Sequence, residues 1–252
     1  MSRVVLKVGS SILTQNSTIA KDRMKNLVEF IVKLRDKHEV ILVSSGAVAA
    51  GYTALKLDKS ILQNKQALAS IGQPILMAKY AKEFATFGVL TAQVLVTAAN
   101  FYDEEQTKRV KDTFDTLLGN GVLPIVNEND ATATKELVVG DNDQLSAYVT
   151  NFSDSDILII LSDIDGYYDK DPRKYSDAKV LKNISHIDKN ELEKEADPNN
   201  NFATGGIVTK LKAADYILRH NRKMVLASGF DLSDIESLML EQKHIGGSIF
   251  SR

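Results

Sequence analysis

Residues 127–143, which read NENDATATKELVVGDND, combine five carboxylates with three asparagines. The cluster consists of Glu128, Asp130, Glu136, Asp141, Asp143, Asn127, Asn129 and Asn142. An apolar run at residues 122–126 leads into it, and apolar residues spaced three and four apart predict an amphipathic helix after Gly140. Because α/β proteins bind ligands where strands end and helices begin, these groups suit a small polar ligand with an ammonium group. The alternative interpretation is a capped helix beside a polar turn.

Two lysines are placed to meet an anion. Lys7 lies in the apolar run at residues 4–8, where a lysine is costly to bury unless it meets an anion, and a glycine and two serines follow. Lys210 lies four residues after Gly206 in the segment TGGIVTK, and a Gly-Gly helix start with a lysine one turn later is typical of phosphate binding. The alternatives are an edge strand whose lysine faces solvent and a flexible helix start with a surface lysine.

Small polar turns follow two more predicted strands. The run at residues 39–43 ends in SSGA, which precedes a helix start and lets backbone N–H groups approach an anion. The run at residues 157–161 ends in the loop SDIDGYYDKDPRK, whose aromatic and acidic residues suit a nucleoside. A tight strand-to-helix turn remains the alternative for the first of these.

Strand and helix patterns alternate along the chain. We expect strands at residues 4–8, 39–43, 89–96, 122–126, 157–161, 223–227 and 246–250, and an extended excursion at 134–139. We expect helices at residues 21–37, from 47, at 61–87, 103–118, from 141, at 188–195, from 204 and at 233–240. The helical segment 61–87 should form two helices or a kink at Pro74. This order predicts a single α/β domain, a three-layer αβα sandwich with a mostly parallel central sheet. The length of the chain leaves two small domains as the alternative.

Composition limits the possible functions. The chain has 252 residues, 44% of them hydrophobic, and a net charge of −2, so general affinity for nucleic acid is not expected. It has no cysteine, which excludes disulfides, thiolate zinc sites and a cysteine nucleophile. Neither a signal peptide nor an apolar run of about 18 residues occurs, so we expect a soluble cytoplasmic protein with no membrane contact.

The glycine-rich turns, the two lysines and the carboxylate cluster together favour phosphoryl transfer, in which a protein mainly supplies positioning and positive charge. The P-loop pattern GxxxxGK[ST], the dinucleotide pattern GxGxxG and the protein-kinase motifs HRD and DFG are absent. The four histidines are scattered without zinc spacing, so no metal ligands are predicted.

Six segments resemble the glutamate kinase branch of the amino-acid kinase superfamily. They are KVGSS (7–11), SSGAVAAG (44–51), NENDA (127–131), VGDND (139–143), SDIDGYYDKDPR (162–173) and TGGIVTK (204–210). The first and fifth segments are shared with aspartate, acetylglutamate, carbamate and UMP kinases, whereas the other four in combination are specific to the glutamate branch. The resemblance covers essentially the whole chain.

The resemblance implies an amino-acid kinase fold and ATP-dependent phosphorylation of the γ-carboxylate of L-glutamate with Mg²⁺, the first step of proline biosynthesis. It further implies a homo-oligomer, a dimer or tetramer, with glutamate bound by residues up to roughly 150 and the nucleotide by the remainder. Many members also carry a C-terminal PUA domain, and no such segment follows within these 252 residues. The alternatives are a kinase for another carboxylate, such as N-acetylglutamate or aspartate, and an amino-acid-sensing module.

The resemblance also assigns individual positions. The catalytic positions are Lys7, Lys210 and Asp143, the last holding the two lysines in place. The ATP-binding positions are Lys7, Gly9, Ser10, Ser162, Asp163, Thr204, Gly205, Gly206, Ile207, Val208, Thr209 and Lys210. The substrate-binding positions are Ser45, Asp130, Asn127 and Asn142. An amino-acid-sensing module would be expected to lack the lysines or Asp143, and all three residues are present.

Overall fold

A computed structural model describes residues 1–15, 18–133, 142–193 and 206–252. Its main sheet has the strand order β5-β6-β4-β1-β7-β9-β10-β8. The strands are β1 (Ser2–Val8), β4 (His38–Ser44), β5 (Thr91–Val96), β6 (Leu123–Glu128), β7 (Ile157–Ser162), β8 (Asn183–Ile184), β9 (Lys223–Ser228) and β10 (Ser248–Phe250). All neighbouring pairs are parallel except β9 and β10. A separate antiparallel pair joins β2 (Thr14–Gln15) to β3 (Thr18–Ile19).

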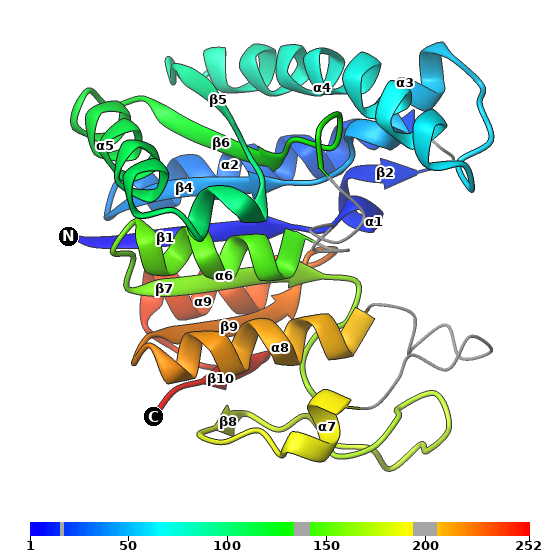
Figure 1. Cartoon of the computed structure of the whole chain (residues 1–252). Coiled ribbons are helices and arrows are strands. Elements are labelled where there is room, and N and C mark those ends of the chain that lie inside the picture. The colour runs from blue at the N-terminus through cyan, green and yellow to red at the C-terminus, as the bar shows by residue number, and fades with distance from the viewer. Residues whose placement is uncertain (16–17, 134–141, 194–205) are drawn as a thin grey trace.

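Helices cover both faces of the main sheet (Figure 1). They are α1 (Ser10–Leu13), α2 (Lys21–Arg35), α3 (Ala47–Ala54), α4 (Leu62–Ala85), the 3₁₀ helix η1 (Ala98–Phe101), α5 (Glu104–Gly119), α6 (Asn142–Phe152), α7 (Lys189–Glu193), α8 (Gly206–Arg219) and α9 (Ser233–Glu241). Helices α2, α4 and α9 pack on one face and α5, α6 and α8 on the other. The predicted three-layer arrangement is therefore confirmed. No helix in the described ranges is long and apolar enough to cross a membrane.

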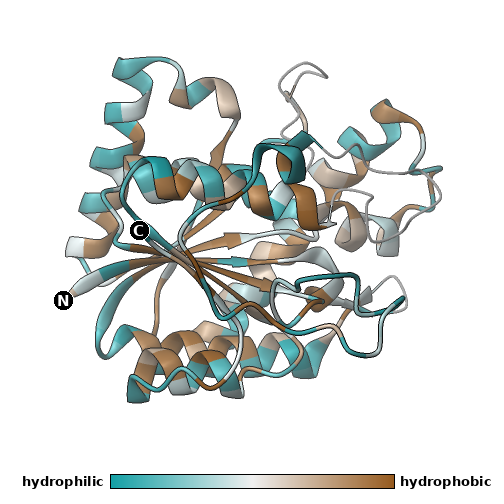
Figure 2. Ribbon diagram, turned by 90° about the horizontal axis from the view of Figure 1, so that it is seen from below, coloured by the Kyte–Doolittle hydropathy of each residue, from teal (hydrophilic) through white to brown (hydrophobic). Residues whose placement is uncertain are grey.

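The two-sided cover explains the apolar strands. In β1, Val4 and Leu6 enter the core beneath α2 and α4, whereas Val5 enters the core beneath α6 and α8. All three are fully buried, as expected for a parallel strand covered on both sides. Figure 2 shows the same arrangement as hydrophobic strands enclosed by helices whose outer faces are hydrophilic. Because side chains alternate along a strand, Lys7 shares the side of Val5 and faces α6 and α8.

Strand β1 lies at the centre of the sheet, paired with β4 on one side and β7 on the other. Strands β4, β5 and β6, which come next in the sequence after β1 in the main sheet, lie on one side of β1. Strands β7 and β9, which come later in the sequence, lie on the other side. This reversal makes the carboxyl end of β1 a topological switch point, where open α/β sheets bind their ligands. Lys7 and the turn that follows it lie at this point.

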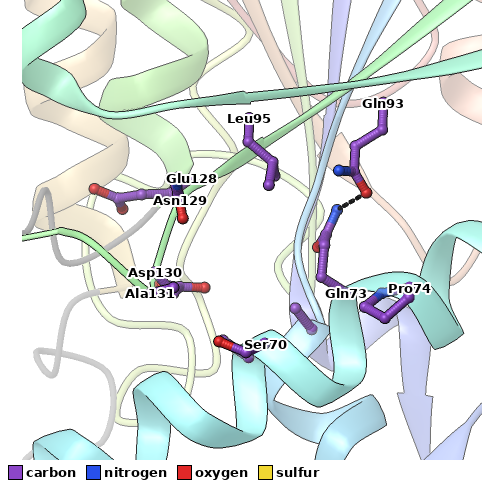
Figure 3. Close-up of a pocket in the computed structure, with 11 residues that line it drawn as sticks. Ser70, Gln73, Pro74, Gln93, Leu95, Glu128, Asn129, Asp130 and Ala131 are labelled. Atoms are coloured by element: carbon purple, nitrogen blue, oxygen red, sulfur yellow. Dashed lines mark hydrogen bonds between the residues drawn. The ribbon is translucent and has the colours of Figure 1, made fainter.

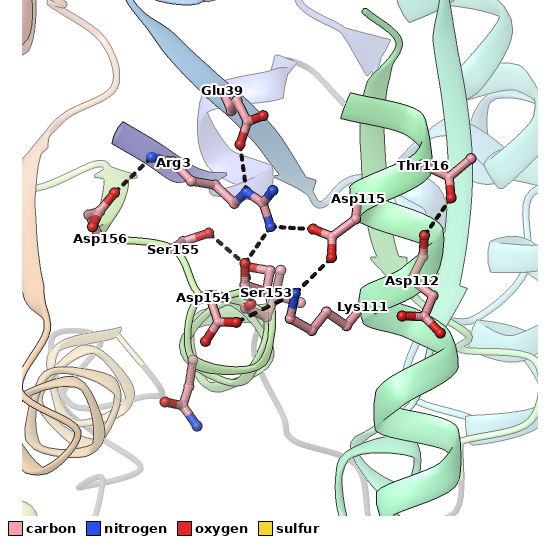
Figure 4. A network of polar contacts seen from close by, with 12 residues as sticks. Arg3, Glu39, Lys111, Asp112, Asp115, Thr116, Ser153, Asp154, Ser155 and Asp156 are labelled. Atoms are coloured by element: carbon pink, nitrogen blue, oxygen red, sulfur yellow. Dashed lines mark hydrogen bonds and ion pairs between the residues drawn. The ribbon is translucent and has the colours of Figure 1, made fainter. Parts of the chain in front are cut away.

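A polar network lies at the start of β1, at the end of the strand opposite to Lys7 (Figure 4). Arg3, at the start of β1, donates to Glu39 on β4 at 2.8 Å, to Asp115 on α5 at 2.7 Å and to the carbonyl of Ser153 at 2.6 Å. Lys111 contacts the second oxygen of Asp115 at 2.7 Å. The network thus ties the start of the central strand to a neighbouring strand, to α5 and to the residue after α6.

The expected strands are all present, with ends shifted by up to two residues. The two-helix alternative for residues 61–87 is wrong, because α4 continues through Pro74. Helix α4 packs so closely on α3 that a Cβ atom on Gly72 would lie 1.8 Å from the Ala47 carbonyl oxygen. Short α1, the β2–β3 pair, η1 and β8 were not predicted. The expected excursion at 134–139 lies outside the described residues.

Candidate active site

Lys7, Asp143 and Lys210 meet at the carboxyl edge of the sheet. The ammonium group of Lys7 lies 2.6 Å from Oδ1 of Asp143, and that of Lys210 lies 3.0 Å from Oδ2. The exposed fractions of the three side chains are 4%, 0% and 6%. The solvent-facing alternatives for both lysines are therefore wrong. One buried carboxylate bridges two lysines that are 203 positions apart in the sequence.

Each member of this trio is fixed by a regular element. Lys7 is the penultimate residue of β1, Asp143 lies in the first turn of α6, and Lys210 lies one turn into α8. Lys210 also donates to the carbonyl oxygen of Gly206 at 2.9 Å, and Thr209 donates to Oδ2 of Asp143 at 3.0 Å. Helices α6 and α8 pack on the same face of the sheet as the Lys7 side chain. The trio is therefore held in place by the fold itself.

The charges of the trio favour an anion. Two ammonium groups contact one carboxylate, so the three side chains together carry one net positive charge. The N-termini of α6 and α8 add the positive ends of two helix dipoles near the same place. This positive potential favours a phosphate or carboxylate ligand.

Other predicted nucleotide positions border the same edge. Ser162 ends β7 and donates to Asp163 at 2.9 Å, while Gly9 donates its N–H to the carbonyl of Leu161 at 3.2 Å. Ser10 begins α1, and Gly9 separates it from the end of β1. Positions Gly206, Ile207, Val208 and Thr209 form the first turn of α8, whereas Thr204 and Gly205 lie outside the described residues.

A second group of polar side chains lies beside the trio and is joined by hydrogen bonds. The side-chain amide nitrogen of Asn142 lies 2.8 Å from the carbonyl oxygen of Ser44, 2.9 Å from Oγ of Ser45 and 2.9 Å from Oδ1 of Asn127, and its two N–H groups are shared among these three acceptors. Three of the four predicted substrate positions are thus in direct contact. They come from the end of β4, the end of β6 and the start of α6.

The fourth position, Asp130, lines a neighbouring cavity of about 250 Å³. Its side chain points into the cavity, and Gln73 and Gln93 face it from the other side (Figure 3). Burial raises the pKa of Asp130, and the charge of Lys65 partly opposes this effect. Burial and then the charge of Asp130 raise the pKa of the neighbouring Glu128 to about 7. The wall around Asp130 thus favours a cationic group.

Three residues have contacts in the site that the sequence did not predict. Thr209 binds Asp143 directly, although its segment was singled out only for phosphates. Gln73 and Gln93 line the cavity and are hydrogen bonded to each other at 3.2 Å. Gln73 adjoins Pro74, and the available signal was a polar residue on the face of the helix that otherwise carries apolar residues such as Leu68 and Leu76. Gln93 alternates with apolar residues in an edge strand, and no sequence pattern marks it.

Comparisons with known proteins identify the family of the chain. Residues 2–228 match the amino acid kinase family. The chain is 53% identical to a glutamate 5-kinase from Wolinella succinogenes, a match that covers 99% of this chain and 98% of the relative. It is 49% identical to a glutamate 5-kinase from Leishmania donovani, covering 99% of this chain and 95% of the relative.

Two solved structures share the fold at low sequence identity. An isopentenyl phosphate kinase from T. acidophilum has a TM-score of 0.68 at 16% identity, covering 99% of this chain and 100% of its own. A carbamate kinase from Giardia lamblia has a TM-score of 0.68 at 16% identity, covering 99% of this chain and 98% of its own. These two likenesses concern the arrangement of strands and helices.

Proposed function

The chain belongs to the amino acid kinase family, and we propose that it transfers the γ-phosphoryl group of ATP to the γ-carboxylate of L-glutamate. The products are L-glutamyl 5-phosphate and ADP, and the reaction is the first step of proline biosynthesis. The observation that carries the proposal is the buried contact of Lys7 and Lys210 with the two oxygens of Asp143. The names of the full-length relatives support glutamate as the acceptor.

The reaction needs charge neutralisation more than proton transfer. A γ-carboxylate is ionised at neutral pH, so no general base is required to activate it. One of its oxygens forms a bond to the γ-phosphorus while the bond to the β,γ-bridging oxygen breaks, and that electron pair leaves with ADP. Negative charge develops between two anions, and Lys7 and Lys210 stabilise it from fixed positions. Asp143 keeps both ammonium groups aligned before the substrates bind.

We assign the amino acid to the side of the sheet formed by β4, β6 and α6. Asp130 is placed to pair with the ammonium group of glutamate, since it lines the cavity and is partly buried. Ser45, Asn127 and Asn142 present a connected set of donors and acceptors for the rest of the molecule. N-acetylglutamate has no ammonium group and would leave Asp130 without its partner. The pocket therefore favours the free amino acid.

We assign ATP to the side formed by β7 and α8. Gly9 and Ser10 lie beside the end of β7, and the start of α8 directs its N–H groups and Lys210 toward the same edge. Ser162 and Asp163 end the adjacent strand, where they are placed to contact the nucleotide. The segment up to roughly residue 150 would then serve glutamate and the remainder mainly the nucleotide, with Lys7 and Asp143 acting on the transferred group.

Magnesium would enter with the nucleotide. In the ranges that the structure describes, no three acidic or histidine side chains converge on a point where an ion would fit. Mg²⁺ is commonly held by substrate phosphates with few protein ligands and many waters, which suits this site. When bound, it would neutralise phosphate charge and complement the two lysines.

The surface is consistent with self-association, and we propose a homo-oligomer, a dimer or tetramer. Strand β5 forms one edge of the main sheet, and Phe87 and Leu90 next to it are 45% and 68% exposed. An unpaired strand edge with apolar neighbours is usually covered in a stable protein. Sedimentation of the purified protein would measure the state, and a monomer at micromolar concentration would contradict this part of the proposal.

The activity is tested by supplying ATP, Mg²⁺ and hydroxylamine, which traps an acyl phosphate as a hydroxamate. We expect hydroxamate with L-glutamate and at least about tenfold less at equal concentration with N-acetylglutamate or aspartate. A preference for either of the other acceptors would assign the chain to a different carboxylate kinase. Binding of glutamate without any ATP consumption would instead indicate an amino-acid-sensing module.

A further inference from the structure

A row of side-chain amides leads from the predicted glutamate site into helix α4. Asn142 donates to Asn127 at 2.9 Å, and Asn127 donates through Nδ2 to Oε1 of Gln73 at 2.9 Å. Gln73 in turn donates through Nε2 to Oε1 of Gln93 at 3.2 Å. The row therefore connects a helix start, the end of a central strand, a long helix and an edge strand.

Two backbone groups identify which way each amide of the row points. The carbonyl of Ser44 only accepts, so the amide of Asn142 must turn its nitrogen toward it. The N–H of Glu128 only donates and lies 2.9 Å from Oδ1 of Asn127, so Asn127 must turn its oxygen inward and its nitrogen toward Gln73. The amide of Gln73 then has one orientation that satisfies its neighbours.

Gln73 is itself held rigidly. It is 7% exposed, and its neighbour Gly72 lies at the crossing of α4 with α3, where a Cβ atom would lie 2.3 Å from the N–H nitrogen of Gly51. Helix α3 begins two residues after Ser45, so this backbone contact also fixes α4 relative to the predicted substrate turn. Gln73 is thus a buried acceptor on an element that cannot shift without moving the site.

We propose that Gln73 is a positioning residue for the acceptor amino acid: by accepting from Asn127 it holds the amides of Asn127 and Asn142 in the orientation that the substrate meets. The proposal rests on the proposed function, because it presumes that Asn127 and Asn142 face the acceptor. Without Gln73, the Nδ2 group of buried Asn127 would lose its partner, and an unsatisfied buried donor is costly. Asn127 would then rotate or attract water, and the substrate would meet a less ordered surface.

The test replaces Gln73 by methionine, which has similar length and flexibility but no strong hydrogen-bonding group. We expect Gln73→Met to raise the KM for glutamate about tenfold, which corresponds to one lost buried hydrogen bond, while the KM for ATP stays within about twofold. The matched control is Gln66→Met, the same exchange two turns earlier in α4 and outside the residues that line the cavity. Its kinetic constants should equal those of the wild type.

A double-mutant cycle separates positioning from general damage. If Gln73 acts through Asn127, Gln73→Met should change the glutamate KM by less than about twofold when Asn127 is already leucine. Equal increases in both KM values, a loss of kcat alone, or effects of the two substitutions that multiply would overturn the proposal. If Gln73→Met does not fold, Gln73→Asn serves instead, because its shorter amide keeps the polarity but does not reach Asn127.

A crystal structure of the variant decides the matter independently of the substrate. We expect the Asn127 amide to leave its contact with Asn142, and unchanged amide positions would overturn the positioning role whatever the protein phosphorylates. Hydroxamate formation by the wild type in the same assay tests the proposed function separately. A wild type inactive on glutamate, with a displaced Asn127 amide in the variant, would reject that function and retain the role of Gln73.

Discussion

The two ends of strand β1 carry the same arrangement of charges in different surroundings. Near its start, Arg3 contacts Asp115, which also contacts Lys111; near its end, Lys7 contacts Asp143, which also contacts Lys210. Each aspartate lies between two cations from different elements. The exposed fractions of Arg3, Asp115 and Lys111 are 16%, 39% and 34%, whereas none in the Lys7 trio exceeds 6%.

Burial changes what such a trio is able to do. At the start of β1, water screens the charges, so the contacts add modestly to stability and fasten secondary-structure elements together. At the end of β1, three charges have been taken out of water, and a buried ion pair often stabilises a protein less than apolar packing would. Three buried charges are useful where a reaction needs charge at a fixed position, because surroundings of low dielectric constant strengthen their interaction with a reacting anion.

The sharpest way to test this contrast is Asp143→Asn. The substitution keeps the shape but leaves Lys7 and Lys210 without their shared counter-charge, and we expect kcat to fall by at least about 10³-fold. Adding Lys210→Ala should then cost far less than it costs in the wild type, because groups that act as one unit are not additive. The double-mutant cycle on kcat measures this.

Thermal unfolding must accompany that cycle, because removing one member of a buried ion pair also destabilises a protein. A variant that melts earlier yet turns over normally below its melting temperature would make Asp143 a structural acid of the first turn of α6. Losses in kcat that simply multiply would likewise remove its organising role.

Lys210→Ala alone should have the next largest effect. Lys210 is 5% exposed, and Asp143 and the carbonyl of Gly206 hold its ammonium group, so it is available to the transition state without reorganisation. We expect kcat to drop roughly 10²-fold or more, with a much smaller change in the KM for glutamate. Steady-state kinetics with both substrates varied provides the measurement. An unchanged kcat would show that Lys7 alone supplies the charge at this edge.

The sequence predicted most of the sheet because strand patterns were strong. Apolar runs such as residues 157–161 are buried on both faces, and such runs are recognisable without tertiary information. The sequence predicted two helices or a kink at Pro74, whereas α4 is a single helix. The close contact of Gly72 with α3 supports the helix next to the proline, and a local sequence pattern does not reveal such a contact. The β2–β3 pair was missed because each strand has only two residues.

The site was predictable where a residue belonged to a motif. Lys7, Asp143 and Lys210 each stood at a strand end or helix start, and resemblance to known kinases joined them. Gln73 and Gln93 lie 20 residues apart in a helix and an edge strand, and only packing brings their amides together. Residue types alone do not separate the buried trio from the exposed one, since both consist of lysine or arginine with aspartate, and only the position of the buried residues in motifs marked them.

At the start of β1 we expect stability to change and catalysis to remain. Arg3→Met removes hydrogen bonds to Glu39, Asp115 and the carbonyl of Ser153. It should lower the free energy of unfolding by about 2–3 kcal/mol, because hydrogen bonds to a charged group are lost and the Ser153 carbonyl loses a partner. Chemical denaturation measures this loss. A fall in kcat of more than a few-fold at a temperature where the variant is folded would mean that the two ends of β1 are coupled.

The pH dependence of stability should also differ between the carboxyl ends of the strands, where Glu128 lies, and the start of β1. Burial raises the pKa of Glu128 to about 7 from an ordinary value of 4.5, so the folded protein holds a proton that the unfolded chain releases. This contribution is complete below pH 4.5 and is lost as the pH rises through about 7. Glu128→Gln does not titrate, so we expect its stability relative to the wild type to increase across that window by roughly 2 kcal/mol. If the denaturation midpoints of the wild type and of Glu128→Gln change in parallel between pH 5 and 8, Glu128 is ionised and stabilised in the folded protein.

The smallest effect should come from Asp115, with the opposite sign. Burial alone would raise the pKa of its carboxyl group, but hydrogen bonds from Lys111 and Arg3 outweigh that effect and hold the pKa below the ordinary value of 3.8. Its stabilisation is therefore present above pH 3.8 and disappears as the pH falls below it. Because the side chain is 39% exposed, Asp115→Asn should cost less than about 1 kcal/mol at pH 7, with the cost vanishing toward pH 3. A loss that persists at pH 3 would come from packing on α5, and the start of β1 would then be held by shape instead of charge.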